Sequence, residues 1–194
     1  MKGIEVFRKL KEMGKGFYTV ADLEKITGLK KNSLYVSLKR WVEMGLLERV
    51  AQGIYVPAGE RVEMEKIAME LYPPCYVSFE SALFKYGVLN QMPFTLTLAT
   101  TRKTRRFRIY GREVEFRKLK EDLFFGFEEI KGVYYALPEK AFLDLIYFYI
   151  MGKAFCDFDE MDLRKLNREK MLSLATSFPQ RVREFVKNEL PYSG

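Results

Sequence analysis

Residues 17–57 read FYTVADLEKITGLKKNSLYVSLKRWVEMGLLERVAQGIYVP and contain the strongest structural pattern in the chain. Thr19 and Asp22 form a variant of the capping box, which predicts that a helix begins there. Gly28 ends that helix, and a second one begins near Asn32 or Ser33. Apolar residues recur at helical spacing in both segments. The stretch therefore predicts two short helices that are joined across a glycine turn.

A short hairpin follows the second helix. Residues 47–50 and 54–56 alternate as strands around Ala51-Gln52-Gly53, and Gly53 can take the positive φ that such a loop requires. Two helices followed by a hairpin predict a winged helix-turn-helix. In that unit the second helix enters the major groove of DNA and the wing lies along the backbone.

The second helix has an apolar side and a basic, amide-bearing side. Asn32 and Arg40 suit base edges, because amides pair with adenine and guanidinium groups pair with guanine. The sequence does not decide where Tyr35 and Val36 lie, since either can pack under the wing or on the N-terminal helix. The candidate DNA-binding residues are Lys31, Asn32, Ser33, Tyr35, Lys39 and Arg40 on this helix and Arg49 and Gln52 on the hairpin.

Phosphate contacts position a protein on DNA without reading its sequence. The residues expected to make them are Lys31, Ser33, Lys39, Arg49 and Gln52. Double-stranded DNA is therefore the expected partner. The alternative is a protein-interaction scaffold with a solvated basic face, because winged helices also serve as dimerisation and docking units.

Composition narrows the possible chemistry. The chain has 194 residues, 48% hydrophobic and 30% charged, with two cysteines and no histidine. Without histidine it lacks the commonest general base and every Ser-His or Cys-His nucleophile. Cys75 and Cys156 have no metal-ligand spacing around them and are interpreted as structural thiols. We therefore expect no catalytic site, no metal and no cofactor.

One enzymatic alternative remains open. Asp122 with Glu129-Ile-Lys131 spells a loose Asp...Glu-x-Lys pattern, which can hold magnesium and a lysine in a nuclease site. Charged residues are so common in this chain that such spacing arises readily by chance. The alternative function is thus a magnesium-dependent nuclease with a winged-helix DNA-binding module.

Nothing in the chain predicts a membrane partner. The N-terminal segment is an amphipathic helix with Ile4, Phe7 and Leu10 expected on its packed side, and it lacks the apolar run of a signal peptide. The most apolar stretch, residues 141–151, is too short to span a bilayer. It is interrupted by Asp144, which we interpret as a group that caps or pairs internally. A soluble, cytoplasmic protein is the expectation.

A second basic zone, TTRKTRRFRIYGREVEFRKLK, covers residues 100–120. Residues 102–120 hold nine Lys or Arg against two Glu, and the apolar alternation predicts a hairpin around Gly111. An alternative to nucleic-acid binding is that these charges protect the outer face of an edge hairpin from aggregation. The candidate second nucleic-acid contact consists of Arg102, Lys103, Arg105, Arg106 and Arg108.

The whole pattern predicts an α+β chain. The expected parts are a winged helix-turn-helix at residues 1–58, a connecting helix within 59–74 and a mixed domain at 75–194 with a small, mainly antiparallel sheet and C-terminal helices. The elements expected there are a helix at 79–86 begun by Ser78, strands at 94–99, 123–130 and 133–137, a helix at 139–151 with Pro138 in its first turn, and helices at 168–176 and 179–190. Apolar residues of the tail are interpreted as core, with a protein interface as the alternative.

Three segments of the second half together resemble the AbiEi-type proteins, the antitoxin and repressor components of abortive-infection toxin–antitoxin systems. They are YVSFESALFKYGVLNQMP at 76–93, the strand and basic hairpin that follow, and ALPEKAFLDLIYFY at 136–149. The resemblance covers roughly residues 15–150. Family members often have histidine where this chain has Tyr86, so any role of that histidine is absent here.

The resemblance implies a function and two partners. It implies an autoregulatory repressor that binds inverted repeats upstream of its own operon. It also implies that the second domain opposes a toxin resembling a nucleotidyltransferase, without a stable complex between the two proteins.

Overall fold

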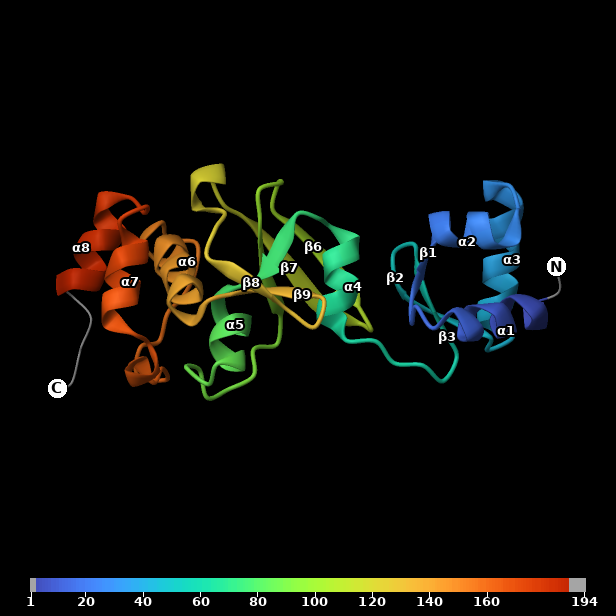
Figure 1. The fold of residues 1–194 in the computed structure, drawn as a ribbon, viewed down its shortest axis with the longest axis horizontal. Helices are drawn as coiled ribbons and strands as arrows, with labels where there is room; N and C mark the ends of the chain where they lie inside the picture. Colours follow the sequence, from blue (N-terminus) through green and yellow to red (C-terminus); the bar gives the residue numbers. More distant parts are fainter. Residues whose placement is uncertain (1–2, 189–194) are drawn as a thin grey trace. The chain divides into compact units, whose positions relative to one another are not determined.

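The structure is a computed structural model of the 194-residue chain, and it describes residues 3–188. The chain is α+β and divides into two compact units (Figure 1). The first unit comprises Met1–Ala68 and Phe107–Gly111, and the second comprises Met69–Arg106 and Arg112–Gly194. Within the described residues there are eight α-helices, a small antiparallel sheet and a larger mixed sheet.

The first unit contains three helices and a three-stranded sheet. The helices are α1 (Gly3–Met13), α2 (Val20–Thr27) and α3 (Lys31–Glu43), and the strands are β1 (Tyr18–Thr19), β2 (Leu47–Ala51) and β3 (Ile54–Pro57). The sheet order is β1-β3-β2, and both pairings are antiparallel. The expected helices and hairpin are present, and β1 is an additional strand of two residues.

The start and end of α2 follow the predicted local chemistry. The Asp22 N–H donates to Thr19 Oγ1 at 3.1 Å, and Asp22 Oδ2 accepts from the Thr19 N–H at 2.9 Å, which completes the capping box. Gly28 has φ of 69° and ends the helix in the left-handed conformation that favours glycine. Both predictions are confirmed.

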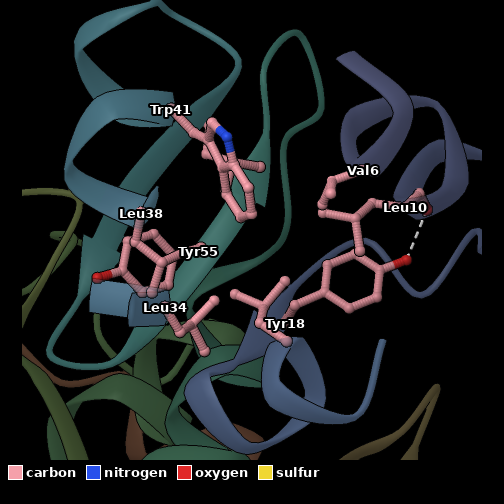
Figure 2. Close-up of a cluster of buried hydrophobic side chains, with 9 residues drawn as sticks. Val6, Leu10, Tyr18, Leu34, Leu38, Trp41 and Tyr55 are labelled. Atoms are coloured by element: carbon pink, nitrogen blue, oxygen red, sulfur yellow. Dashed lines mark hydrogen bonds between the residues drawn. The ribbon is translucent and has the colours of Figure 1, made fainter. Parts of the chain in front are cut away.

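The core of the first unit lies where the three helices meet the sheet (Figure 2). Leu34, Leu38 and Trp41 of α3 are buried in it, as the helical spacing predicted. The Tyr18 hydroxyl donates to the Leu10 carbonyl of α1 at 2.6 Å, so this buried polar group is paired. These contacts link α1 to the strand that precedes α2.

The packed side of α1 differs from the expectation. Val6 and Leu10 are buried, whereas Ile4 is 54% exposed. Val6 and Leu10 stand four residues apart and share one face of the helix, while Ile4 lies off that stripe. The prediction of the packed side was therefore wrong for Ile4.

Helix α4 (Met64–Leu71) follows the small sheet, and the division between the units falls inside it, after Ala68. Its buried residues are Ile67 and Ala68. A helix of eight residues is thus present within the segment 59–74, where a connecting helix was expected.

The larger sheet has six strands in the order β6-β7-β5-β4-β9-β8, and all of it except residues 107–109 of β6 belongs to the second unit. The strands are β4 (Cys75–Val77), β5 (Leu96–Thr100), β6 (Arg105–Ile109), β7 (Arg112–Lys118), β8 (Phe127–Ile130) and β9 (Val133–Ala136). β5 pairs with β7 in parallel, and β4 pairs with β9 in parallel. The sheet is therefore larger than predicted, and it is mixed.

Strand β4, which the sequence did not predict, explains this difference. Only three residues long, it follows Pro73-Pro74 and is too short to show a period in the sequence. It lies in the middle of the sheet, between β5 and β9, and joins the two halves. The strand expected at 123–130 is also shorter, because Glu121–Leu123 forms a 3₁₀ turn and Gly126 has φ of 71°.

Four helices complete the second unit (Figure 1). They are α5 (Phe79–Lys85), α6 (Pro138–Ile150), α7 (Arg168–Ala175) and α8 (Gln180–Asn188). α5 and α6 pack together against the sheet, and α7 and α8 pack on α6. Pro138 begins α6 as predicted, since proline lacks only an N–H that the first turn leaves unpaired. The last expected residues of the final helix, 189 and 190, lie outside the described residues.

The tail supplies part of the core, as the sequence-based interpretation expected. Leu166, Met171 and Phe178 are buried, whereas Met161, Leu163, Leu172 and Leu174 are partly exposed and Phe155 is 82% exposed. Within residues 3–188, no helix combines the length and apolar character that crossing a membrane requires.

Candidate nucleic-acid interface

Helix α3 presents the predicted candidate residues together on its exposed face. Lys31, Asn32, Ser33, Tyr35, Lys39 and Arg40 are all exposed, while the opposite face is buried in the core. Asn32, Val36 and Arg40 stand four residues apart, so they form one row along the helix. An exposed row of mixed amide, apolar and guanidinium groups has the chemistry that base edges recognise.

The side chains that could read bases have no partner in the part of the chain that the structure describes. Among residues 3–188, the side chains of Asn32 and Arg40 form no hydrogen bond or ion pair. Lys39 has one ion pair, with Glu43 at 3.9 Å, and the two side chains are 80% and 63% exposed. Such an exposed pair contributes little to stability and is readily exchanged for a phosphate.

The first turn of α3 also favours an anion. Lys30 precedes the helix, and no side chain caps the N-terminus. The backbone N–H groups of the first turn and the positive end of the helix dipole therefore face outward. Lys31 and Ser33 lie in this turn and add a charge and a hydroxyl group. The arrangement suits a phosphate group of a nucleic-acid backbone.

Val36 and Tyr35 were the two positions that the sequence left open. Val36 is 63% exposed and Tyr35 is 48% exposed, so neither is packed beneath the hairpin. Apolar groups on a groove-binding helix contact the thymine methyl group. Val36 is therefore a candidate site residue that the sequence-based prediction did not select, and its place on the exposed side of the helix was the only signal for it.

Arg49 lies on β2, which contacts α3, and Gln52 lies in the turn that follows β2. Arg49 lies opposite Tyr55 in the register of β2 and β3, and Gln52 is exposed in the connecting turn. Burial raises the pKa of Tyr55, the charge of Arg49 acts to lower it, and Tyr35 acts to raise it further. These electrostatic effects place the Arg49 guanidinium and Tyr35 near one buried tyrosine. The structure thus brings candidate residues of α3 and the hairpin together.

The basic residues of the second zone differ from one another in their contacts. The Arg102 and Arg105 guanidinium carbons lie 4.0 Å and 5.6 Å from the centre of the Tyr72 ring, and the Tyr72 hydroxyl donates to the Lys103 carbonyl at 3.1 Å. Stacking of this kind orients a guanidinium group without neutralising its charge. Arg102 and Lys103 therefore remain exposed cations on the loop before β6, and Arg105 is an exposed cation at the start of β6.

Arg106 and Arg108 differ from each other. Arg106 donates to Glu115 Oε1 at 3.0 Å and lies 3.7 Å from Glu113, so its charge is balanced within the hairpin. Arg108 is exposed on β6 and, within residues 3–188, has no ion-pair partner. Arg108 is thus better suited than Arg106 to contact a phosphate.

The residues of the pattern that suggested a nuclease lie in three different parts of the fold. Asp122 lies in the 3₁₀ turn and Glu129 in β8, and both are exposed, as is Lys131 in the turn after β8. Among the described residues, no three acidic, cysteine or histidine side chains are grouped in a way that could hold a metal ion. Both cysteines are buried, which raises each thiol pKa to about 12.

A buried polar network lies within the second unit. Lys140 donates to Asp144 and to the Tyr76 hydroxyl, and Ser78 and Tyr76 donate to Asp144 at 2.8 Å and 3.0 Å. Burial lowers the pKa of Lys140 and raises that of Asp144. The interpretation that Asp144 pairs internally is confirmed, but Ser78 precedes α5 without capping it through its side chain.

The partner Lys140 was missed, although a lysine and an aspartate four residues apart on an apolar helix are a recognisable signal. Both side chains have no exposed surface, so this network has no access for a substrate. Its contacts tie α6 to β4 and thereby hold the sheet and helix layers in register.

Comparison with known proteins adds no family to these observations. No protein-family model matches the chain, and no curated relative does. Its function is therefore proposed from the residues of α3, the hairpin and the basic zone.

Proposed function

We propose that the chain is a sequence-specific DNA-binding transcriptional regulator whose first unit is a winged helix-turn-helix. The observation that carries this proposal is the exposed row on α3, where Asn32 and Arg40 have no partner within residues 3–188. In this proposal α3 is the recognition helix and enters the major groove. The β2–β3 hairpin is the wing and contacts the backbone through Arg49 and Gln52.

Charge supports a nucleic-acid partner. The chain carries a formal net charge of +7, and the two basic zones account for its excess of cations. Lys31, Ser33 and Lys39 supply phosphate contacts, while the row of Asn32, Val36 and Arg40 supplies base contacts. Arg102, Lys103, Arg105 and Arg108 form a second, nonspecific contact to the phosphate backbone.

The proposed biological role is that of an autoregulatory repressor and antitoxin. Its support is the resemblance of residues 76–93, 95–120 and 136–149 to AbiEi-type proteins. The proposed operator is an inverted repeat upstream of the chain's own operon. The proposed opponent is a toxin that resembles a nucleotidyltransferase and forms no stable complex with this chain.

A gel-shift experiment tests the DNA-binding proposal. The full chain is titrated onto a duplex containing its own upstream region and onto a shuffled duplex of equal length and composition. We expect binding to the upstream duplex to be tighter by roughly a thousandfold or more at physiological salt, the lower range for specific regulators. Equal binding to both duplexes would exclude sequence-specific regulation, and no binding to either would favour a protein-interaction scaffold.

The antitoxin role has a separate test. A nucleotidyltransferase-like reading frame beside this gene is expected, and its product should arrest growth of a host cell when expressed alone. Coexpression of this chain should restore growth. Failure to restore growth would reject the antitoxin role while leaving the repressor role to the gel shift.

A further inference from the structure

A pocket of about 480 Å³ lies in the second unit, beside β7. Its walls come from the loop before β6, from β7, and from the end of α6 with the residues that follow it. Its volume is within the range of sites that bind small molecules. The charged side chains of its lining are Lys103, Glu115, Arg117, Lys118 and Lys153.

The single carboxylate of the pocket is already neutralised. Glu115 Oε1 accepts from Arg106 at 3.0 Å, and Oε2 accepts from Arg117 Nε at 2.9 Å. Burial acts to raise the pKa of Glu115, but Arg117 and Arg106 outweigh it and hold that pKa below its ordinary value. Arg117 is also bound by Glu80 at 2.9 Å. Glu115 is therefore ionised and engaged, and it is not free to balance the lysines.

Three exposed lysines are among the residues that line the pocket. Within residues 3–188, Lys103, Lys118 and Lys153 form no ion pair with a carboxylate. They come from three separate segments that meet around one concave surface. Lysine is a strong point-charge ligand for phosphate groups, and nearby cations attract an anion more strongly in a recess than on a flat surface.

Two uncharged residues shape the same pocket. Thr104 Oγ1 accepts from the Lys118 backbone N–H at 3.0 Å, which ties the loop to β7. The Thr104 hydroxyl keeps its own proton available for donation to a ligand. Phe148 of α6 is buried beneath the charged groups, with its ring centre 6.0 Å from the Arg117 guanidinium carbon. The hydrogen bond of Thr104 and the buried ring of Phe148 thus fix two sides of the pocket.

We infer that this pocket binds a small molecule that carries a chain of two or more phosphate groups. Three separated ammonium groups fit several adjacent negative charges better than one, and the Thr104 hydroxyl adds a neutral donor. The inference goes beyond the proposed DNA binding and needs no DNA. The same phosphate chemistry has a second source, the backbone of a nucleic acid, because Lys103 also belongs to the second basic zone.

Calorimetric titration of the full chain with inorganic triphosphate, without DNA, tests the inference. We expect saturable binding at one site per chain. The double variant Lys118→Gln and Lys153→Gln should weaken it about tenfold or more, because it removes two charged side chains from the lining; a tenfold loss corresponds to about 1.4 kcal/mol. The matched control is Lys131→Gln, an exposed lysine in the β8–β9 turn at the opposite edge of the sheet, and it should bind as the wild type does.

Three outcomes would overturn the inference. They are the absence of saturable triphosphate binding, equal weakening by the Lys131→Gln control, and tighter binding of a single-stranded oligonucleotide of equal charge than of triphosphate. Gel shifts with the upstream duplex on the same double variant separate this inference from the proposed function. If the double variant loses triphosphate binding but still binds DNA, the phosphate site in the pocket is supported independently of the role of α3.

Discussion

Lys140 donates a hydrogen bond to Asp144 one turn further along α6, and neither side chain has any exposed surface. The Lys140 ammonium also lies 5.0 Å and 5.2 Å from the ring centres of Phe125 and Phe178. A buried pair of this kind gains mutual attraction but loses the hydration of both charges. Replacement of one partner should therefore lower the free energy of unfolding much more than replacement of both.

The variant Asp144→Asn should lower the free energy of unfolding by about 3–5 kcal/mol, because it leaves the Lys140 charge buried without a counter-charge. The double variant Lys140→Met with Asp144→Leu should recover most of that loss. Urea unfolding followed by far-ultraviolet circular dichroism measures both. If the double variant is as unstable as the single one, the loss of stability comes from the surrounding hydrogen bonds rather than from the ion pair.

Removal of the α2 cap should destabilise the first unit. The variant Thr19→Ala loses both hydrogen bonds between its hydroxyl and Asp22 and should cost about 1 kcal/mol. Trp41 is the only tryptophan of the chain and is buried in this unit's core, so its fluorescence reports the transition. The matched control is Thr176→Ala, at an exposed residue of the second unit. An unchanged Trp41 midpoint in Thr19→Ala would contradict the role of the cap.

The stability of the first unit should fall in acid because of Asp22. Burial acts to raise the pKa of Asp22, but Lys15 at 2.7 Å and the Thr19 donors outweigh it and hold that pKa below its ordinary value. The unfolded chain therefore takes up a proton first as pH falls. The stabilisation is fully present above the ordinary carboxyl pKa and is lost as pH falls through the lower pKa of the folded state.

The measurement compares urea midpoints of wild type and Asp22→Asn by Trp41 fluorescence over a series of pH values. The difference between the two proteins should be constant near neutral pH and shrink in acid below the ordinary pKa of the carboxyl group. A difference that does not depend on pH would assign the role of Asp22 to its shape rather than its charge.

Arg40 should contribute to sequence recognition rather than to general affinity. The variant Arg40→Ala should weaken binding to the preferred duplex by about 1–3 kcal/mol and binding to random DNA by much less, because a bidentate contact reads one base. Lys39→Ala is the matched variant one residue earlier on α3, and it should weaken both duplexes equally. Equal loss on both duplexes in Arg40→Ala would reassign Arg40 to a phosphate contact.

The second basic zone should appear in the salt dependence of DNA binding. Replacement of Arg105 and Arg108 by Gln should reduce the slope of log affinity against log salt by roughly 0.9 for each lost phosphate contact. Arg106→Gln is the matched control, because Glu115 and Glu113 already neutralise that guanidinium. If the slope is unchanged in the double variant, the zone does not contact DNA, and its charges are better explained as protection of the edge hairpin from aggregation.

Local signals predicted much of the first unit. The Thr19–Asp22 capping box, the Gly28 turn and the apolar spacing of Leu34, Leu38 and Trp41 all act within a few residues of the chain. The exposed face of α3 follows from the same spacing, because burial of one helix side leaves the other to solvent. Ile4 was misassigned because α1 has two nearby apolar stripes, and only packing selects one.

The sheet of the second unit depended on long-range pairing. Strand β4 has three residues, and its place between β5 and β9 comes from partners far along the chain, as in Val77 opposite Leu98 and Tyr135. A pattern within so short a strand cannot specify such partners. The mixed topology therefore could not be deduced from local periodicity.

The sequence by itself determined both ends of α2, the basic character of two zones and the absence of histidine chemistry. Helix α3 begins at Lys31, slightly before the predicted start at Asn32 or Ser33. Tertiary structure alone decided which of the basic side chains have a carboxylate partner. Arg106 and Arg117 are neutralised by carboxylates that adjacent strands and α5 bring to them, while Lys103, Lys118 and Lys153 line one pocket and have no carboxylate partner among residues 3–188. Composition counts these cations alike, but electrostatic energy depends on the distance between charges, and folding sets that distance.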